Sequence, residues 1–216
     1  MITLTVDKKE IQVEEGSPLL KACLDHGIYV PNLCYVETLE APPVSCRLCF
    51  VEIEGEREPV TSCNIQVSDG MVVHTDTPSV RRLQRTAFQL LMSVHRVDCA
   101  HCPANKRCEL QRIARFLKIG LKPGPLIQTL KEPDILEDHP VFDYYPNRCV
   151  LCGRCIHACQ VQRVLPLMSF AERGFETVIR FYNEADLTDV PCTECLACVS
   201  TCPVGAIALK GGSGLS

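Results

Sequence analysis

The first seventy or so residues alternate apolar and polar side chains in short runs typical of β-strands. Ile2 to Val6 and Glu10 to Val13 follow this alternation on either side of the polar turn Asp7-Lys8-Lys9, which predicts a pair of half-buried strands. Further strand candidates follow at Phe50 to Ile53, Val60 to Cys63 and Met71 to His74. We therefore expect residues 1–78 to form a small β-rich domain.

One helix is predicted inside this β-rich segment. Ser17 can act as its N-cap, Pro18 suits its first position, and Gly27 can end it. Its apolar face consists of Leu19, Leu20, Cys23 and Leu24. We expect Cys23 to be a buried core thiol, which is a common place for a free cysteine.

Residues 79–140 are predicted to be helical at first and irregular afterwards. Ser79 can cap a helix that runs to about His95. Its apolar positions are Leu83, Ala87, Leu90, Leu91 and Val94. A second, shorter helix is expected from about Asn105 to Phe116. Four prolines lie between residues 120 and 140, so we interpret this stretch as a linker along the surface.

An internal repeat occupies residues 141–210. The run Cys149-x2-Cys152-x2-Cys155-x3-Cys159 recurs as Cys192-x2-Cys195-x2-Cys198-x3-Cys202. Strand-like segments are expected at Glu176 to Tyr182 and at Ala206 to Leu209. Residues 211–216 are rich in glycine and serine and are predicted to be a flexible tail. The whole chain is thus predicted to be α+β, with three domains over 1–78, 79–140 and 141–210.

Composition narrows the function. With 22% charged and 46% hydrophobic residues, the 216-residue chain is globular in character. A net charge of −4 argues against a nucleic-acid binder, and no apolar run is long enough to span a membrane. The N-terminus lacks the features of a secretory signal, so we expect a cytoplasmic protein. In that reducing compartment, sixteen cysteines are expected to bind metal rather than form disulfides.

The repeated cysteine run is the strongest chemical signal. Its spacing is that of bacterial ferredoxins, in which three cysteines of one run bind a 4Fe–4S cluster and the fourth reaches the other cluster. This predicts one site from Cys149, Cys152, Cys155 and Cys202, and another from Cys159, Cys192, Cys195 and Cys198. Zinc is the alternative, but it prefers paired Cys-x2-Cys knuckles in tetrahedral sets.

A second set, Cys34-x11-Cys46-x2-Cys49-x13-Cys63, lies in the β-rich segment. Plant-type 2Fe–2S ferredoxins have four residues between their first two cysteines, so the eleven found here depart from that pattern. A loop through Pro42-Pro43 can still return Cys46 and Cys49 to Cys34. We expect a 2Fe–2S cluster on these four thiolates, with zinc as the alternative.

The third set, His95-x3-Cys99-x2-Cys102-x5-Cys108, contains three cysteines and needs a fourth ligand. From the residues alone His95 is a candidate, a structural histidine at a helix end is the alternative, and His101 is a competitor. The number of cysteines in the chain is consistent with one histidine ligand. Fifteen cysteines and one histidine make sixteen ligands, enough for four clusters, and leave Cys23 over.

These four sets, in this order, resemble the iron–sulfur N-terminal region of iron-only hydrogenases and NAD-linked formate dehydrogenases. They are also similar to the iron–sulfur chain of NADH:quinone oxidoreductases and to the diaphorase subunit of NAD-reducing hydrogenases. The family's β-grasp 2Fe–2S motif is met at Cys46-Arg47-Leu48-Cys49-Phe50-Val51-Glu52. Its one-histidine, three-cysteine 4Fe–4S motif is met by His95, Cys99, Cys102 and Cys108. The resemblance therefore implies that His95 is a ligand.

The expected function is electron relay. We expect a non-catalytic subunit that passes single electrons through one 2Fe–2S and three 4Fe–4S clusters. The relay would connect a partner that carries flavin and binds NAD(P)H with a second redox catalytic subunit of the hydrogenase or formate dehydrogenase type, electron-bifurcating complexes included. No dinucleotide-binding or catalytic motif is present in the chain itself. The alternatives are a free-standing multicluster ferredoxin and a zinc-stapled scaffold.

Overall fold

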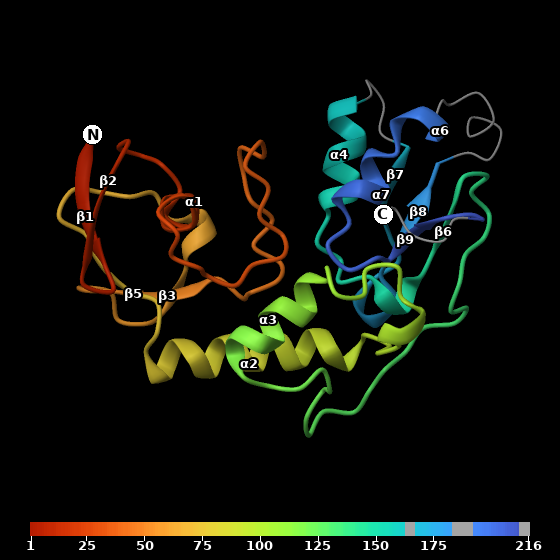
Figure 1. Cartoon of the computed structure of the whole chain (residues 1–216), viewed down its shortest axis with the longest axis horizontal. Helices are drawn as coiled ribbons and strands as arrows, with labels where there is room; N and C mark the ends of the chain where they lie inside the picture. Colours follow the sequence, from red (N-terminus) through yellow and green to blue (C-terminus); the bar gives the residue numbers. More distant parts are fainter. Residues whose placement is uncertain (163–166, 183–191, 212–216) are drawn as a thin grey trace. The chain divides into compact units, whose positions relative to one another are not determined.

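The computed structural model describes residues 1–162, 167–182 and 192–211 as an α+β chain. It divides into two compact units, Met1–Gln89 and Leu90–Ser216 (Figure 1). The tail predicted to be flexible lies outside the described residues, apart from Gly211. Within the described ranges, no helix combines the length and the apolar character that crossing a membrane requires.

The N-terminal unit is built on a mixed five-stranded sheet in the order β2-β1-β5-β3-β4. Its strands are β1 (Ile2–Val6), β2 (Lys9–Val13), β3 (Phe50–Ile53), β4 (Val60–Thr61) and β5 (Val72–His74). The predicted hairpin is confirmed, with β1 and β2 antiparallel and β1 parallel to β5. Asp7 and Lys8 have φ angles of 49° and 70°, the left-handed backbone that a tight hairpin turn requires.

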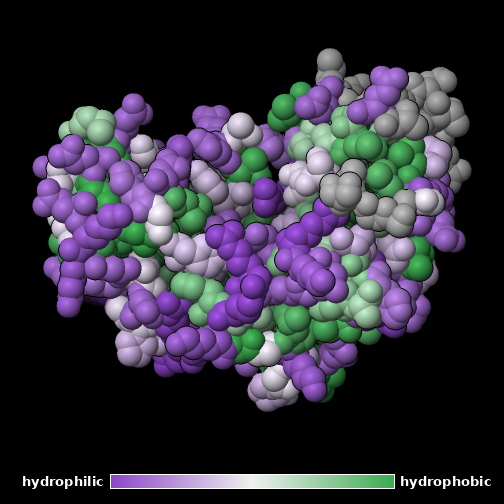
Figure 2. All heavy atoms as spheres, viewed as in Figure 1, coloured by the Kyte–Doolittle hydropathy of each residue, from purple (hydrophilic) through white to green (hydrophobic). Residues whose placement is uncertain are grey.

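Alternation along these strands places apolar side chains on one face. Leu4, Val6 and Ile11 are buried in the core, whereas the intervening β2 side chains Glu10 and Gln12 are exposed. Hydrophilic side chains accordingly predominate over this part of the molecule in Figure 2. Because successive side chains of a strand point to opposite faces, the pattern fixes which face meets the core.

Helix α1 (Leu19–Asp25) packs its apolar face into the same core, and Cys23 is fully buried there, as predicted. The expected Ser17 cap is wrong. Pro18 occupies the N-cap position with an extended backbone, and the Ser17 carbonyl instead accepts a hydrogen bond from Val67 N at 2.9 Å. Gly27 follows the helix with φ 74°, which confirms it as the terminating glycine.

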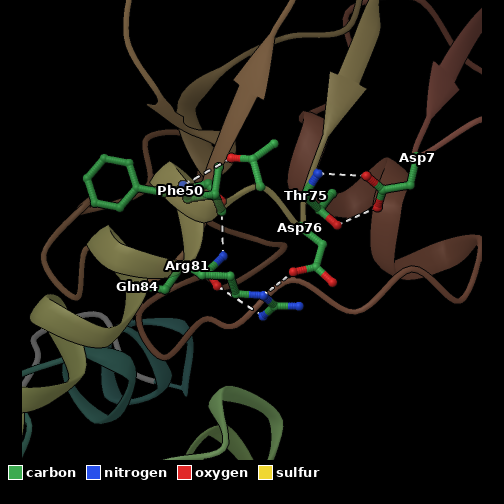
Figure 3. Close-up of polar contacts among 8 residues, drawn as sticks. Asp7, Phe50, Thr75, Asp76, Arg81 and Gln84 are labelled. Atoms are coloured by element: carbon green, nitrogen blue, oxygen red, sulfur yellow. Dashed lines mark hydrogen bonds and ion pairs between the residues drawn. The ribbon is translucent and has the colours of Figure 1, made fainter.

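Helix α2 (Pro78–Ser93) begins two residues earlier than a helix capped by Ser79 would. Thr77, not Ser79, caps it, because the Thr77 hydroxyl accepts a hydrogen bond from Val80 N at 3.1 Å. Figure 3 shows how the start of α2 meets the sheet. The buried Gln84 side chain donates to the Phe50 carbonyl at 3.1 Å, and Asp7 accepts from Thr75 N at 2.8 Å.

The buried face of α2 also differs from the expected stripe. Leu90 is 55% exposed, whereas Phe88 and Met92 are fully buried. Both stripes have helical spacing, so periodicity alone does not choose between them.

The C-terminal unit contains two small antiparallel sheets and four described helices beyond α2. Strand β6 (Phe142–Tyr144) pairs with β9 (Ile207–Leu209), and β7 (Met168–Ala171) pairs with β8 (Val178–Phe181). The helices are α3 (Glu109–Leu117), α4 (Arg154–Gln162), α6 (Cys192–Cys195) and α7 (Ala197–Thr201). Helices α4 and α7, one from each copy of the cysteine repeat, pack against each other.

The proline-rich stretch before β6 is tied to this unit by hydrogen bonds. Thr129 N donates to the Ser93 carbonyl at 2.8 Å, and the Gln128 side chain donates to the His95 carbonyl at 2.8 Å. The buried Asn147 side chain bonds both the N–H and the carbonyl of Lys131, at 2.7 and 2.9 Å. These contacts position the segment between the helices and the cysteine repeat.

Candidate metal centres

The four cysteines of the N-terminal unit are all buried, each with an exposed fraction of 4% or less. Cys34 and Cys46 come from the long loop between α1 and β3, Cys49 directly precedes β3, and Cys63 lies in the 3-10 helix Ser62–Asn64. The Sγ atoms of Cys34 and Cys46 are 3.4 Å apart. The Ser62 hydroxyl donates to the Cys49 carbonyl at 2.9 Å and so ties the two later cysteines together.

Within this set, the cysteines of each hydrogen-bonded pair share a proton. The contact favours the thiolate form of one sulfur in each pair. The hydrogen bond with Cys46 lowers the pKa of Cys34 to about 5, and the corresponding contact with Cys49 lowers the pKa of Cys63. The backbone N–H of Leu48 favours the Cys46 thiolate, although hydrogen bonding to Cys34 and burial raise the pKa of Cys46 overall. The charge of Cys34 acts on the other three cysteines, and Cys34 is hydrogen-bonded with Cys46, so the structure brings the four side chains of the predicted set together.

The three cysteines of the second set are grouped at the start of α3. Cys99 and Cys102 lie at a 3-10 turn, and Cys108 is the N-cap residue of α3. Burial raises the pKa of Cys108, while the backbone N–H groups of Gln111 and Leu110 and the charges of Cys102 and Cys99 also act on it. Amides at a helix N-terminus therefore point to this sulfur, which suits a thiolate ligand.

The two histidine candidates for this set differ in their surroundings. Burial lowers the pKa of His95 to about 4, so its ring is neutral near pH 7, and its Nδ1 is buried without a hydrogen-bond partner. His101 is 80% exposed and pairs with Asp98 at 2.9 Å. A neutral, unpartnered ring nitrogen is the state in which histidine binds metal. The structure thus supports the choice of His95 over His101, and the ligand role itself stays a prediction.

The loop after Cys102 lies against the end of the cysteine repeat. Cys102 Sγ is 3.7 Å from the Val204 carbonyl, and Glu109 N donates to the Pro203 carbonyl at 3.0 Å. Gly205 has φ 68°, and an added Cβ there would stand 2.9 Å from the Ala104 Cβ and 3.4 Å from Cys102 Sγ. Glycine is required at this position by both the backbone angle and the close approach.

In the C-terminal repeat, one pocket is lined by Cys149, Cys152, Cys155 and Cys202, the first predicted 4Fe–4S set. Its remaining walls are mostly apolar and include Val150, Ile179 and Ile207. Backbone N–H groups point to the sulfurs: Leu151 N is 3.4 Å from Cys149 Sγ, and Ala206 N is 3.2 Å from Cys202 Sγ.

A second pocket is lined by Cys159, Cys192, Cys195 and Cys198, the other predicted set. Leu167 N donates to Cys159 Sγ at 3.4 Å. Its walls include His139, which is buried, lies parallel to Phe142 at 3.6 Å between ring centroids and lines the pocket with it. Each pocket thus combines three cysteines of one copy of the repeat with the last cysteine of the other.

Two helices explain this exchange. Helix α4 carries Cys155 and Cys159 four residues apart, so they lie on the same face, one turn from each other, and line different pockets. Helix α7 carries Cys198, and Cys202 is its C-cap residue. The charge of Cys198 acts on Cys155, which places the two pockets within electrostatic reach of each other.

The donor chemistry fits iron–sulfur clusters. All sixteen cysteines are free thiols, and fifteen of them fall in the four groups described above. The walls of the two C-terminal pockets are mostly apolar, and backbone amides there donate the hydrogen bonds that such ligands accept. In the described part of the chain, no three His, Cys, Asp or Glu side chains converge closely enough to hold a single metal ion.

Sequence reasoning missed several residues around these sites. Tyr144 lines the first pocket together with Cys149. Burial raises the pKa of Cys149, while hydrogen bonding with the Tyr144 hydroxyl and the charge of the buried Lys131 act in the opposite direction. His139 lines the second pocket. Tyr144 ends β6 (Phe142–Tyr144) five residues before Cys149, and no sequence motif links a tyrosine at that spacing to a ligand cysteine.

Comparison with known proteins follows the same order along the chain. Residues 1–78 match the model of a 2Fe-2S iron-sulfur cluster binding domain. Residues 84–121 match an NADH-ubiquinone oxidoreductase-G iron-sulfur binding region, and residues 148–206 match a 4Fe-4S dicluster domain.

Similar whole chains are also known. NADP-reducing hydrogenase subunit HndD of Solidesulfovibrio fructosivorans is 36% identical over 96% of this chain and 36% of its own length. A subunit of an NADH-quinone oxidoreductase of Rhizobium meliloti (strain 1021) is 33% identical over 96% of this chain and 24% of its own length. The chain therefore spans only a quarter to about a third of these relatives.

A solved structure agrees over the full length. A chain in the crystal structure of NAD+-reducing [NiFe]-hydrogenase in the H2-reduced state superposes with a TM-score of 0.86 at 26% sequence identity. The match covers 100% of this chain and 90% of that one. Segment by segment, the chain is thus similar to a 2Fe-2S cluster binding domain, an NADH-ubiquinone oxidoreductase-G iron-sulfur binding region and a 4Fe-4S dicluster domain, as the resemblance of its cysteine motifs indicated.

Proposed function

We propose that this chain is an electron-transfer subunit that relays single electrons between a flavin-containing, NAD(P)H-linked partner and a second redox catalytic subunit. It would bind one 2Fe–2S and three 4Fe–4S clusters. The proposed ligand sets are Cys34, Cys46, Cys49 and Cys63; His95, Cys99, Cys102 and Cys108; Cys149, Cys152, Cys155 and Cys202; and Cys159, Cys192, Cys195 and Cys198. The proposed domains span 1–78, 79–140 and 141–210.

The observation that carries this proposal is the pair of pockets in the C-terminal unit. Each is lined by four cysteines that combine both copies of the repeat. Zinc sites do not need this exchange, because paired cysteine knuckles close a tetrahedron around one ion. A cubic cluster presents a corner that the tight loop of three cysteines does not reach, and a distant thiolate meets it.

The chain's own residues have three tasks in this proposal. Cysteine thiolates and one neutral imidazole hold the clusters, backbone amides donate to sulfur, and apolar side chains exclude water. The clusters, when bound, supply single-electron transfer at potentials that depend on hydrogen bonds, burial and ligand type. Cys155 and Cys159 lie one turn apart on α4 and line the two different pockets, and this closeness supports passage between the two C-terminal sites.

The partners are inferred from relatives. One relative is named as a subunit of an NADP-reducing hydrogenase, and another as a subunit of an NADH-quinone oxidoreductase. A chain of very similar fold occurs in an NAD+-reducing hydrogenase. We infer that this chain also works inside a multisubunit complex, in a cytoplasm reducing enough to keep its sixteen cysteines free.

The test is anaerobic purification of the chain from its natural source under native conditions. We expect it to co-purify with a flavoprotein and its clusters to be reduced by NADH or NADPH, as followed by electron paramagnetic resonance (EPR). A monomeric chain whose clusters are reduced by neither NADH nor NADPH would contradict the subunit role and favour a free-standing ferredoxin. Cys23→Ala, which removes a core thiol outside the four sets, is the matched control and should leave cluster reduction unchanged.

A further inference from the structure

We propose that the Tyr144 hydroxyl donates a hydrogen bond to Cys149 Sγ and thereby raises the reduction potential of the cluster held by Cys149, Cys152, Cys155 and Cys202. This inference rests on the proposed function, because it concerns a cluster at that site. Tyr144 would be a positioning and tuning residue rather than a ligand.

The backbone fixes where this side chain points. Tyr144 is the last residue of β6 and pairs with Ile207 of β9. On its other side its N–H donates to the Leu136 carbonyl at 2.9 Å, and its carbonyl accepts from Leu136 N at 2.8 Å. The side chain is only 1% exposed and lines the same pocket as the four cysteines. The backbone is thus held on both edges of the strand and the side chain is buried. The ring therefore has little freedom to turn away from the sulfurs.

The hydroxyl's partners determine the direction of its hydrogen bond. Its oxygen accepts a hydrogen bond from Ile179 N at 3.2 Å. The side chain of Cys149 is its other hydrogen-bond partner, and a ligating thiolate can only accept. Because the phenol oxygen already accepts from Ile179 N, its own proton is left to be donated within the pocket that Tyr144 and Cys149 both line. The proton therefore lies between the phenol oxygen and the sulfur.

The sign of the effect follows from charge. A hydrogen bond donated to a thiolate offsets part of its negative charge, and this interaction strengthens as the cluster gains an electron. The reduced state is stabilised more than the oxidised state, so the potential rises. The buried Lys131 acts in the same direction, because its charge also favours the Cys149 thiolate.

The experiment is a redox titration of the reconstituted full-length chain, followed by EPR. Tyr144→Phe keeps the ring and removes the donor, so we expect one 4Fe–4S midpoint to shift to a more negative potential and the others to stay in place. Tyr145→Phe is the matched control. The neighbouring ring lies under the Arg148 guanidinium at 4.0 Å and does not line the pocket of the four cysteines, so its variant should shift no midpoint.

A second variant covers the case in which Tyr144→Phe binds less iron. Replacing Tyr144 with a ring-fluorinated tyrosine keeps the shape and the bond from Ile179 but makes the hydroxyl a stronger donor. The same midpoint should then move to a more positive potential. Fully loaded variants with an unchanged midpoint would overturn this inference while leaving the relay function standing. A wild-type chain that binds no clusters would instead overturn the proposed function itself.

Discussion

At the scale of single residues, burial decides the protonation state of the candidate ligands before metal binds. Desolvation raises the pKa of Cys152 and of Cys198 to about 12 each. The same effect lowers the pKa of His95 to about 4. Cluster assembly must therefore displace protons from the thiols but not from the imidazole, because the histidine is already in its neutral, metal-binding form.

This difference predicts the effect of exchanging the histidine for a thiolate. His95→Cys should keep four clusters per chain, and the midpoint of one 4Fe–4S cluster should move to a more negative potential, because a thiolate adds a negative charge that imidazole lacks. A redox titration followed by EPR measures the midpoint. His101→Ala changes an exposed histidine of the same loop and serves as the control. Equal midpoints in His95→Cys and the wild type would refute the assignment of His95.

His139 predicts a pH dependence of stability. Burial, and then the charge of Lys210, lower its pKa to about 4 in the folded chain from 6.5 when unfolded. Between these values the unfolded chain binds a proton that the folded chain does not, so stability falls as the pH drops through this window.

His139→Phe retains an aromatic ring to pack on Phe142 but does not titrate. From pH 7.5 to pH 5.5, the wild type should lose about 1 kcal/mol more unfolding free energy than this variant. Anaerobic urea titrations of the two loaded proteins at both pH values measure the difference. Parallel pH profiles would show that His139 is not held neutral by the fold.

At the scale of elements, short helices distribute the ligands between sites. A spacing of four residues along α4 separates Cys155 from Cys159, and the same spacing relates Cys198 of α7 to Cys202. In both cases the two cysteines line different pockets. Two cysteines one helical turn apart can therefore each contribute a sulfur to a different site. The packing of α4 against α7 keeps the two helices in the positions that this exchange requires.

The exchange predicts which variants share a phenotype. Cys202→Ser should change the EPR spectrum of the same cluster as Cys149→Ser, although the two residues lie far apart in the sequence. Cys159→Ser should match Cys192→Ser in the same way. If Cys202→Ser and Cys198→Ser altered one common cluster instead, each copy of the repeat would hold its own cluster and the pairing proposed here would be wrong.

The start of α2 gives a prediction on stability. Thr77→Ala removes the hydroxyl that accepts the Val80 N–H bond, so we expect a loss of about 1 kcal/mol in unfolding free energy. Ser79→Ala changes a hydroxyl residue two positions further on and should cost less. Denaturant unfolding of the two variants makes the comparison. A larger loss in Ser79→Ala would restore the cap expected from the sequence.

These elements also show how much of the fold could be predicted from the sequence. Alternation predicted the β1–β2 hairpin because side-chain period, turn and burial all agree there. The cysteine spacing predicted which four cysteines line each C-terminal pocket, because the repeat itself contains the exchange. The predicted caps of α1 and α2 were wrong. Pro18 and Thr77 occupy these positions because of backbone geometry and neighbouring strands, which the local sequence does not reveal. Leu90 and Phe88 satisfy the same periodicity, and only tertiary packing chooses between them.

The contacts around the sulfurs could not be predicted from the sequence for a related reason. Tyr144 reaches Cys149 because β6 pairs with β9, and His139 reaches the second pocket because it stacks on Phe142. Both contacts depend on the way the strands and the segment before them are folded, which no local pattern encodes. Metal-site spacing was therefore predictable from the sequence, whereas the surroundings that tune the sites were not.

At the scale of the whole molecule, metal binding and folding are expected to be coupled. The described helices of the C-terminal repeat are short, and their cysteines surround apolar pockets. Short helices gain little stability from their own hydrogen bonds, so coordination should supply much of the folding free energy of this unit. The N-terminal unit has a five-stranded sheet and its own apolar core and should depend less on its metal.

The most direct test of the central claim is elemental and spectroscopic analysis of the full chain after strictly anaerobic reconstitution. We predict about 14 iron atoms and about as many acid-labile sulfides per chain, with Mössbauer and EPR spectra that resolve one 2Fe–2S and three 4Fe–4S clusters. A folded, colourless chain that contains zinc and no stoichiometric iron would contradict the account.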